Sequence, residues 1–203
     1  TMIDLVAVGA RCREVGAALA LDITQSIGAM PFDAAAVQPD FLVGAGYKWL
    51  MTPYSVGFLW AAPQHRSGKS LELGFIARAN HPSFGHITGH DLPFAVSGHR
   101  FDVGESGNFT LMPAACAAME QLTEWGPAMI QETLTAYTAP IADWARERGL
   151  LVAEDRFRAG HFVGIRFPGG LPERAVERLA ARNVFVSKRG DSLRITPHLY
   201  NDD

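Results

Sequence analysis

Residues 40–50 read Asp-Phe-Leu-Val-Gly-Ala-Gly-Tyr-Lys-Trp-Leu, and the interpretation of the chain starts from this stretch. Its apolar run at 41–43 predicts a short strand, and Gly44-Ala45-Gly46 predicts a turn directly after it. Lys48 follows that turn, with an aromatic residue on either side. In open α/β sheets, ligands bind beyond the carboxyl ends of strands, where glycine lets the backbone approach closely. A lysine amine placed there can form a Schiff base, whereas an ordinary loop lysine with a solvated amine is the simpler interpretation.

Two more apolar runs flank this stretch. The run at 17–21 ends at Asp22, and a second covers residues 56–61. Continuous apolar runs of this length predict strands buried on both faces, as in a parallel sheet. A helical pattern over 3–16 precedes them and ends at a glycine cap. Alternating helices and strands predict an α/β architecture for this part of the chain.

Asp22 stands at the end of its strand, in the same topological position as Lys48. A carboxylate at this position is either buried with a strong partner or caps a helix that begins near Thr24. Its functional interpretation is a counter-ion to a protonated ring nitrogen. Gln25 lies three residues further on, where it either hydrogen-bonds a ligand oxygen or serves as a polar turn residue.

The middle of the chain changes from irregular to helical. Residues 62–108 are rich in Gly, Pro, Ser and His and show no clear periodicity, which is typical of functional or mobile loops. Helices are predicted over 111–122 and 128–148, and Trp125-Gly126-Pro127 separates them. Pro140 is a candidate kink in the second helix.

The last part of the chain predicts a small α+β module. Strands are expected at 162–167, 184–187 and 193–196, and a helix at 172–182. Arg194 lies inside the last strand between two apolar residues. We therefore expect it to be less exposed than most of the 15 arginines of the chain.

The composition narrows the possible functions. The chain has 203 residues, of which 48% are hydrophobic and 19% charged, with a net charge of −3. These values indicate a globular protein, and no basic excess points to nucleic-acid binding. No apolar run reaches the roughly 18 residues that a membrane span needs. The two cysteines cannot form a disulfide framework, so a reducing compartment, the cytoplasm, is expected.

Histidine and cysteine positions do not predict a metal site. Five of the seven histidines fall between residues 65 and 99, and their spacing fits no zinc pattern. These five are His65, His81, His86, His90 and His99. We expect solvated loop residues or substrate contacts there. Cys12 and Cys116 are expected to be small core residues.

Taken together, the motifs resemble those of the class V aminotransferase family, whose members are fold-type I enzymes that use pyridoxal 5′-phosphate (PLP). The resemblance covers essentially the whole chain and rests on LDITQSIGAMP at 21–31, DFLVGAGYKWL at 40–50, GFLW at 57–60, RFDVGESGNF at 100–109 and NVFVSKRGDSLRITPHLYN at 183–201. It implies an α/β fold in which residues 1–126 belong to the large PLP-binding domain, with its mainly parallel sheet. Residues 127–203 would form the small C-terminal α+β domain.

The resemblance also implies roles for the residues around the lysine. Lys48 would form the internal aldimine with PLP, and Asp22 would pair with the pyridine nitrogen. PLP is an electron sink only while that nitrogen is protonated, which a buried carboxylate favours. Gln25 would hydrogen-bond the phenolic oxygen. Tyr47 would reach the phosphate, as in the kynureninase branch, although many relatives have His before the lysine.

Further implied contacts lie later in the chain. Ser106 and Asn108 match a loop that, in relatives, approaches the phosphate of the neighbouring subunit's cofactor, so a homodimer with shared active sites is expected. Arg194 would bind the substrate α-carboxylate through its guanidinium fork. Arg189 and Arg100 are weaker candidates.

Several reactions are compatible with these residues. A PLP-dependent aminotransferase acting on an amino acid is the preferred hypothesis, and a kynureninase-like hydrolase or C–S lyase comes next. Desulfurase chemistry of the family type is disfavoured because residues 150–193 contain no cysteine. A non-catalytic binding protein on the same fold is a further alternative. A nucleotide-binding α/β domain is weaker still, because no G-x-G-x-x-G or P-loop motif is found.

Members of this family are nearly twice as long as this sequence. We therefore expect the 203 residues to be the C-terminal part of a longer protein that also has a last helix beyond residue 203. The same comparison predicts that the chain alone binds PLP poorly and turns over nothing.

Overall fold

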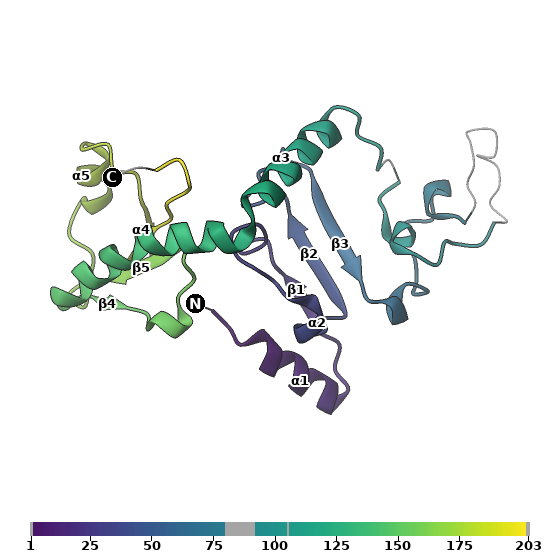
Figure 1. Cartoon of the computed structure of the whole chain (residues 1–203), viewed down its shortest axis with the longest axis horizontal. Helices are drawn as coiled ribbons and strands as arrows, with labels where there is room; N and C mark the ends of the chain where they lie inside the picture. Colours follow the sequence, from purple (N-terminus) through teal and green to yellow (C-terminus); the bar gives the residue numbers. More distant parts are fainter. Residues whose placement is uncertain (1, 80–91, 105, 202–203) are drawn as a thin grey trace. The chain divides into compact units, whose positions relative to one another are not determined.

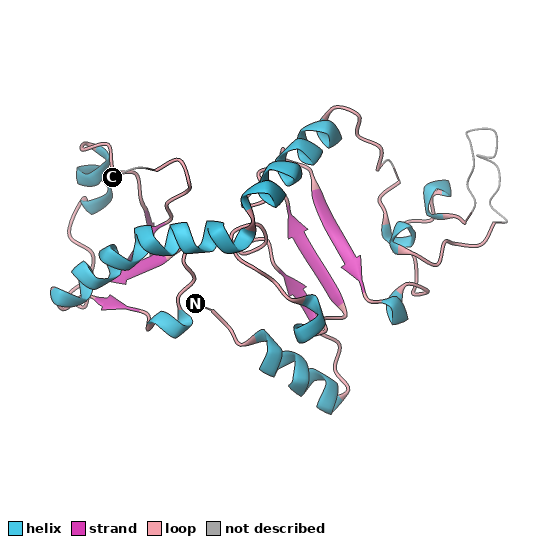
Figure 2. Cartoon of the chain, in the orientation of Figure 1, coloured by secondary structure: helices cyan, strands magenta, loops and turns pink. Residues whose placement is uncertain are grey.

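The computed structural model describes residues 2–79, 92–104 and 106–201 (Figures 1 and 2). These residues form two compact units. The first, called the N-terminal unit, comprises Leu5–Gly28 and Phe32–Glu124. The second, called the C-terminal unit, begins at Trp125 and also takes in residues 29–31 and the residues before Leu5. The assignment of 1–126 and 127–203 to a large and a small domain stays a prediction.

The N-terminal unit is built on a three-stranded sheet of order β1-β2-β3, in which β1 and β2 are parallel and β3 is antiparallel to β2 (Figure 1). Its helices and strands are α1 (Leu5–Val15), β1 (Ala20–Asp22), α2 (Ala34–Val37), β2 (Phe41–Ala45), β3 (Gly57–Ala61) and α3 (Leu111–Trp125). The described part of the irregular segment contains the short 3₁₀ helices η1 (Pro63–His65), η2 (Phe75–Ala77) and η4 (Gly98–Phe101). The structure therefore confirms an α/β arrangement, with one parallel and one antiparallel strand pair.

Helix α1 ends as the sequence predicts. Gly16 adopts φ = +71°, and its N–H donates to the carbonyl of Arg13 at 3.2 Å. The N–H of Ala17 donates to the carbonyl of Cys12 at 2.9 Å, which completes a Schellman cap. The cap turns the chain out of α1 toward the first strand.

Strand β1 differs from the predicted strand at 17–21. It begins three residues later, and both Ala20 and Asp22 are exposed, so the prediction of burial on both faces was wrong. Asp40 accounts for the late start of the strand. Its carboxylate accepts the N–H of Leu19 at 2.7 Å, and its own N–H donates to the carbonyl of Leu19 at 2.8 Å. The backbone before Ala20 is thus hydrogen-bonded to an aspartate, and β1 is an edge strand.

Strand β2 runs further than the sequence predicted. Gly44 and Ala45 continue the strand, and the turn begins only at Gly46. Gly44 is needed inside the strand because a Cβ there would lie 2.6 Å from Cε1 of Phe58 on β3. The ring of Phe58 therefore takes the space that a side chain at position 44 would fill.

The C-terminal unit is a long helix packed on a small antiparallel sheet of order β4-β5-β7-β6. Its elements are α4 (Pro127–Glu147), β4 (Leu151–Val152), η5 (Asp155–Phe157), β5 (Val163–Arg166), α5 (Ala175–Ala180), β6 (Ser187–Arg189) and β7 (Ser192–Ile195). The core between helix and sheet is formed by Ala142, Ala145, Val163 and Ile165. Helix α4 follows the predicted break at Gly126, with Pro127 at its first position, and continues through Pro140.

Two predictions for this unit need correction. The strand predicted at 184–187 is β6, which starts only at Ser187, because residues 183 and 184 belong to the turn that ends α5. The N–H of Asn183 donates to Ala180 and that of Val184 to Leu179, and Asn183 adopts φ = +60°. Strand β4 is short and was not predicted.

Helix α3 corrects the prediction for one cysteine. Cys116 is exposed, whereas its neighbour Ala115 and the later Leu122 are the buried residues of the helix. Cys12 is half-buried. None of the described helices combines the length and the apolar character needed to cross a bilayer.

Candidate active site

The turns that follow β1 and β2 lie at the same end of the sheet, where both strands finish. Because the two strands are parallel, Asp22 at the end of β1 pairs with Val43 of β2, a few residues before Lys48. The N–H of Ile23 continues this pairing by donating to the carbonyl of Val43 at 2.9 Å. The positive charge of Lys48 contributes to the lowered pKa of Asp22. The sheet therefore brings together the two residues on which the sequence hypothesis chiefly depends.

Asp22 is held as a carboxylate by its neighbour Thr24. Hydrogen bonds from the side chain and the backbone of Thr24, and then the charge of Lys48, lower the pKa of Asp22, while burial acts against them. The backbone bond joins the Thr24 N–H to Oδ1 of Asp22 at 2.9 Å. At neutral pH the group is ionised and can pair with a cation.

Neither position predicted for Asp22 from the sequence is correct. The residue is exposed, so it is not a buried carboxylate. It caps a turn and not a helix, because the chain forms turns over 24–26 and Gly28 adopts φ = +90°. A positive φ at Gly28 stops helical hydrogen bonding before it propagates.

Thr24 is a site residue that sequence reasoning missed. Its side chain is 7% exposed, and its Oγ1 accepts the N–H of Ala45 at 2.9 Å. The same residue thus hydrogen-bonds Asp22 and fixes the end of β2. The spacing Asp-x-Thr, typical of a side-chain turn, was the available signal.

The turn that carries Lys48 is closed by backbone hydrogen bonds. The N–H of Thr52 donates to Gly46 at 3.1 Å, and that of Met51 donates to the carbonyl of Lys48 at 3.2 Å. Gly46 has no room for a Cβ, because the hydroxyl of Thr52 occupies that space. Lys48 itself is half-buried. The backbone that carries Lys48 is therefore held by the hydrogen bonds of its turn.

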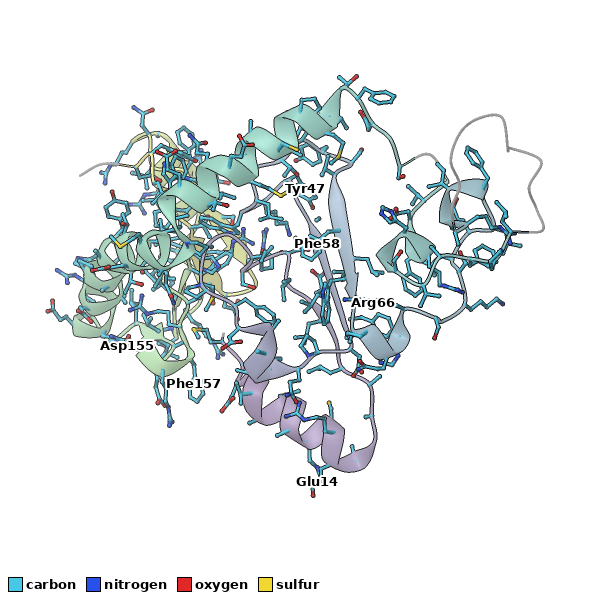
Figure 3. All side chains as sticks on the ribbon, turned by 45° about the vertical axis from the view of Figure 1, so that its right-hand side comes forward. Glu14, Tyr47, Phe58, Arg66, Asp155 and Phe157 are labelled. Carbon is cyan, nitrogen blue, oxygen red and sulfur yellow. The ribbon has the colours of Figure 1, made fainter. Side chains whose placement is uncertain are left out.

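Tyr47 is paired with a second tyrosine beside the lysine. Its ring stacks on that of Tyr54, with centroids 4.5 Å apart and an interplanar angle of 17°. The Nζ of Lys48 lies 5.8 Å from the Tyr47 ring centroid. Tyr47 is 40% exposed and Tyr54 75%. In Figure 3, Tyr47 and Arg66 mark opposite ends of the sheet. Tyr54 is a neighbour that the sequence did not single out.

The remaining predicted contacts of this unit lie in two loops. Gln25 is exposed in the turn after Asp22. Ser106 and Asn108 are exposed in the loop before α3, where Oδ1 of Asn108 accepts the N–H of Leu111 at 2.9 Å. Asn108 therefore caps α3, a structural use of its side-chain oxygen.

Arg194 belongs to the C-terminal unit. It is half-buried on β7, and its guanidinium carbon lies 5.3 Å from the ring centroid of Phe162. Its Nε is buried without a hydrogen-bond partner. By contrast, Arg100 donates to the carbonyls of Ala95 at 2.7 Å and Gly68 at 2.8 Å, so its role is structural.

The described histidines of the irregular segment pair with single aspartates. Nε2 of His65 lies 2.6 Å from Oδ1 of Asp40, and Nδ1 of His99 lies 2.8 Å from Oδ2 of Asp102. Within the described ranges, His, Cys, Asp and Glu form no group of three that could hold a metal ion. The other histidines of the segment, His81, His86 and His90, lie outside the described residues.

Comparison with known proteins shows a match over most of the chain. Residues 1–193 match the family model of the class V aminotransferases. An uncharacterized aminotransferase of Bacillus subtilis (strain 168), YcbU, is 29% identical over 203 residues, which make up 98% of this chain and 51% of that protein. The chain thus spans about half the length of this relative.

Solved structures show the same fold. The cysteine desulfurase CsdA of Escherichia coli superposes with a TM-score of 0.76 at 18% identity, covering 100% of this chain and 52% of that one. The pyridoxamine-pyruvate aminotransferase of Mesorhizobium loti superposes with a TM-score of 0.68 at 21% identity, covering 97% of this chain and 50% of that one. At these identities the likeness establishes the fold and does not select between the two reactions.

Proposed function

The chain belongs to the class V aminotransferase family, whose members use PLP, and on this premise we propose that it forms the lysine-bearing part of an aminotransferase acting on an amino acid. The observation that carries the proposal is the placement of Asp22 and Lys48 together at the carboxyl ends of two parallel strands. A protonated pyridine needs an ionised carboxylate to accept its N–H, and an aldehyde needs a lysine amine to condense with it. Asp22 and Lys48 are a carboxylate and an amine of these kinds.

The residues at this end of the sheet have the chemical groups that the cofactor needs. Lys48 would attach it covalently through Nζ, and Asp22 would hold the proton on its ring nitrogen. Gln25 would donate to its phenolic oxygen, and the hydroxyl of Tyr47 would donate to its phosphate. When bound, PLP supplies an electron sink for the electron pair left at Cα of the amino acid.

Lys48 would also move the proton of the reaction. Once its amine is displaced by the substrate amine, Nζ can take the proton from Cα as a general base. In transamination, Nζ of Lys48 would deliver this proton to the cofactor and not back to Cα, and hydrolysis by water would then release the keto acid. The backbone bonds that close the turn at 46–52 hold the main chain from which this side chain extends.

Arg194 would orient the substrate by its α-carboxylate. A guanidinium fork forms two parallel, charge-assisted hydrogen bonds with a carboxylate. The Phe162 ring beside the guanidinium and the unsatisfied Nε support this role.

We further propose a homodimer in which the loop with Ser106 and Asn108 approaches the cofactor phosphate of the second copy. Large apolar side chains on the same segment of the N-terminal unit are more than half exposed, as expected of an interface. They are Leu71, Leu73, Val96, Val103 and Phe109. Phe109 follows Asn108 directly and is 92% exposed.

Borohydride trapping tests the assignment of the lysine. The chain is mixed with increasing PLP, reduced with borohydride, digested and mapped by mass spectrometry. We expect the label on Lys48 at the lowest PLP concentration, with little on Lys69 and Lys188, which complete the lysines of the sequence. Lys48→Ala should lose the label and Lys69→Ala should keep it. Equal labelling of all three lysines would contradict the proposal and favour a non-catalytic protein.

A panel of amino acids then tests the reaction. The test uses a full-length protein that contains this chain, because the 203 residues alone are expected to turn over nothing. We expect the absorbance of its bound cofactor to shift with the true substrate, followed by formation of a keto acid when a second keto acid is supplied. Release of alanine without a keto acid would instead identify a kynureninase-like hydrolase. Release of sulfide with no need for a second keto acid would identify a C–S lyase.

A further inference from the structure

Helix α4 packs on one face of the small sheet in the C-terminal unit. Val163 and Ile165 of β5 point into the core formed with α4, and their strand partners are Ile195 and Leu193 of β7. Side chains alternate along a strand, so the residues between these belong to the opposite face. Arginine recurs on that face, at Arg166 of β5, Arg189 of β6 and Arg194 of β7.

The strand register places these arginines beside one another. Ser192 of β7 pairs with Arg166 on one side and with Arg189 on the other. Neighbouring strands lie about 4.8 Å apart, so the three residues form one row across the sheet. Arg194 lies on the same face two residues along β7, about 6.7 Å away, and pairs with Gly164 and Ser187.

The arginines of this face differ from other arginines of the unit in their ion pairing. Earlier in the chain, in the same unit, Arg146, Arg156 and Arg158 each form an ion pair with an aspartate or glutamate, with nitrogen–oxygen distances of at most 3.2 Å. Within the described ranges, Arg166, Arg189 and Arg194 form no such ion pair, and the strand positions of their face carry only Leu, Gly, Ser and Arg. Like charges held on adjacent strands repel one another, so an anion bound among them would relieve this cost.

The face also has room and hydroxyl groups for a ligand. A Cβ placed on Gly164, opposite Arg194, would meet no atom within 4 Å. Ser192 lies between Arg166 and Arg189, and Ser187 lies beside Arg194. Guanidinium groups with intervening hydroxyls are suitable donors for carboxylate oxygens.

We propose that this face binds a substrate with two carboxylates, so that the amino acid is a dicarboxylic one. Arg194 holds the α-carboxylate, and the row Arg166–Ser192–Arg189 holds the carboxylate at the far end of the side chain. The spacing of about two residues along a strand between Arg194 and the row matches two carboxylates separated by a short carbon chain. The role of Arg194 rests on the proposed function, whereas the row follows from the sheet itself.

Calorimetric titration of the full chain without PLP tests this site. Glutarate is the dicarboxylate probe and butyrate the monocarboxylate probe, at constant ionic strength. We expect glutarate to bind at least about tenfold more tightly than butyrate, since its second carboxylate adds one charge-assisted interaction. Arg166→Gln and Arg189→Gln should each reduce glutarate affinity about tenfold and so remove most of the preference for glutarate over butyrate.

Arg178→Gln on the exposed side of α5 is the matched control and should change neither affinity. Circular dichroism and melting of each variant establish that it is folded. Equal affinity for glutarate and butyrate would overturn the proposal, as would unchanged glutarate binding in both row variants. Inorganic phosphate binding as tightly as glutarate would also overturn it, because the face would then be a general anion site.

The titration and the borohydride test of Lys48 can fail independently, so they distinguish the dicarboxylate site from the proposed function. Glutarate selectivity without an adduct on Lys48 would contradict the proposed function and leave the dicarboxylate site standing. An adduct on Lys48 without glutarate selectivity would contradict the site and leave the proposed function standing.

Discussion

Gly28 places the two turns of the candidate site against each other through a single backbone position. It adopts φ = +90°, and a Cβ there would lie 2.9 Å from the carbonyl carbon of Trp49. The backbone after β1 therefore touches the backbone next to Lys48. Only glycine fits, because both the angle and the contact exclude a side chain.

Gly28→Ala should lower the free energy of unfolding by about 2–4 kcal/mol, since left-handed strain and an overpacked contact add. Gly16→Ala is the matched control, because Gly16 has φ = +71° but a Cβ at that position would meet no atom within 4 Å. It should cost about 1–2 kcal/mol. Urea unfolding followed by tryptophan fluorescence measures both. Equal losses in the two variants would show that the contact with Trp49 adds nothing.

Asp40 links stability to pH. The N–H of Leu19 and then the side chain of His65 lower the pKa of this carboxyl. A lowered folded pKa means that the stabilisation is present above the ordinary value of 3.8 and is lost as pH falls through the lower folded value. We therefore expect Asp40→Asn to be less stable than the original chain at pH 7, with a gap that shrinks steadily below about pH 4.

Urea unfolding at several pH values measures this gap. Asp191→Asn, in the exposed turn between β6 and β7, is the control and should show no comparable pH-dependent gap. A gap for Asp40→Asn that is constant from about pH 7 to about pH 3 would exclude the charge as its cause.

Among the structural elements, the loop before α3 has two candidate roles, helix capping and cofactor binding, which variants of Asn108 can distinguish. Asn108 caps the helix through Oδ1, and the resemblance to relatives assigns the same residue to cofactor binding. Its bonds to the N–H groups of Thr110 at 3.2 Å and Leu111 at 2.9 Å satisfy two of the unpaired donors of the first turn.

Asn108→Ala should lower the free energy of unfolding by about 1 kcal/mol, and Asn108→Ser by less, because serine also caps helices. Thermal unfolding followed by circular dichroism measures the difference. If Asn108 also binds the phosphate, both variants should weaken trapping of PLP on Lys48, whereas a purely structural cap would leave trapping in Asn108→Ser unchanged.

Some element boundaries can be predicted from the local sequence pattern alone. The end of α1 and the start of α4 agree with the sequence because Gly16, Gly126 and Pro127 act on their own backbone. The first residues of β1 and β6 differ from those that the sequence predicted. Asp40 displaces the start of the first strand, and the turn at Asn183 displaces the start of the second.

At the scale of the whole molecule, exposed apolar side chains favour self-association. The proposed homodimer predicts a species of twice the 22.0 kDa chain mass in sedimentation equilibrium. Phe109→Ser should raise the dimer dissociation constant about tenfold or more, because removal of a buried interface aromatic costs more than about 1.4 kcal/mol.

Tyr200→Ser is the control for this experiment, since Tyr200 is 82% exposed but lies in the other compact unit. It should leave the dimer unchanged. A chain that sediments as a monomer at all concentrations would contradict the shared active site.

Local patterns along the chain predicted the types and order of most elements and the family, and they identified the motifs around Lys48. These depend on periodicity, caps and glycines, which act within a few residues along the chain. The same patterns indicated that Asp22 and Lys48 lie at the same end of the sheet, because both follow strands of a parallel pair.

Only the tertiary structure decided which strand lies at an edge, and hence that Asp22 is exposed and ionised beside Thr24. It likewise decided that Tyr54 stacks on Tyr47 and that Arg166, Ser192 and Arg189 share a row. Strand register and neighbours arise from contacts between residues far apart in the chain, and a shift of one residue would move each strand side chain to the opposite face.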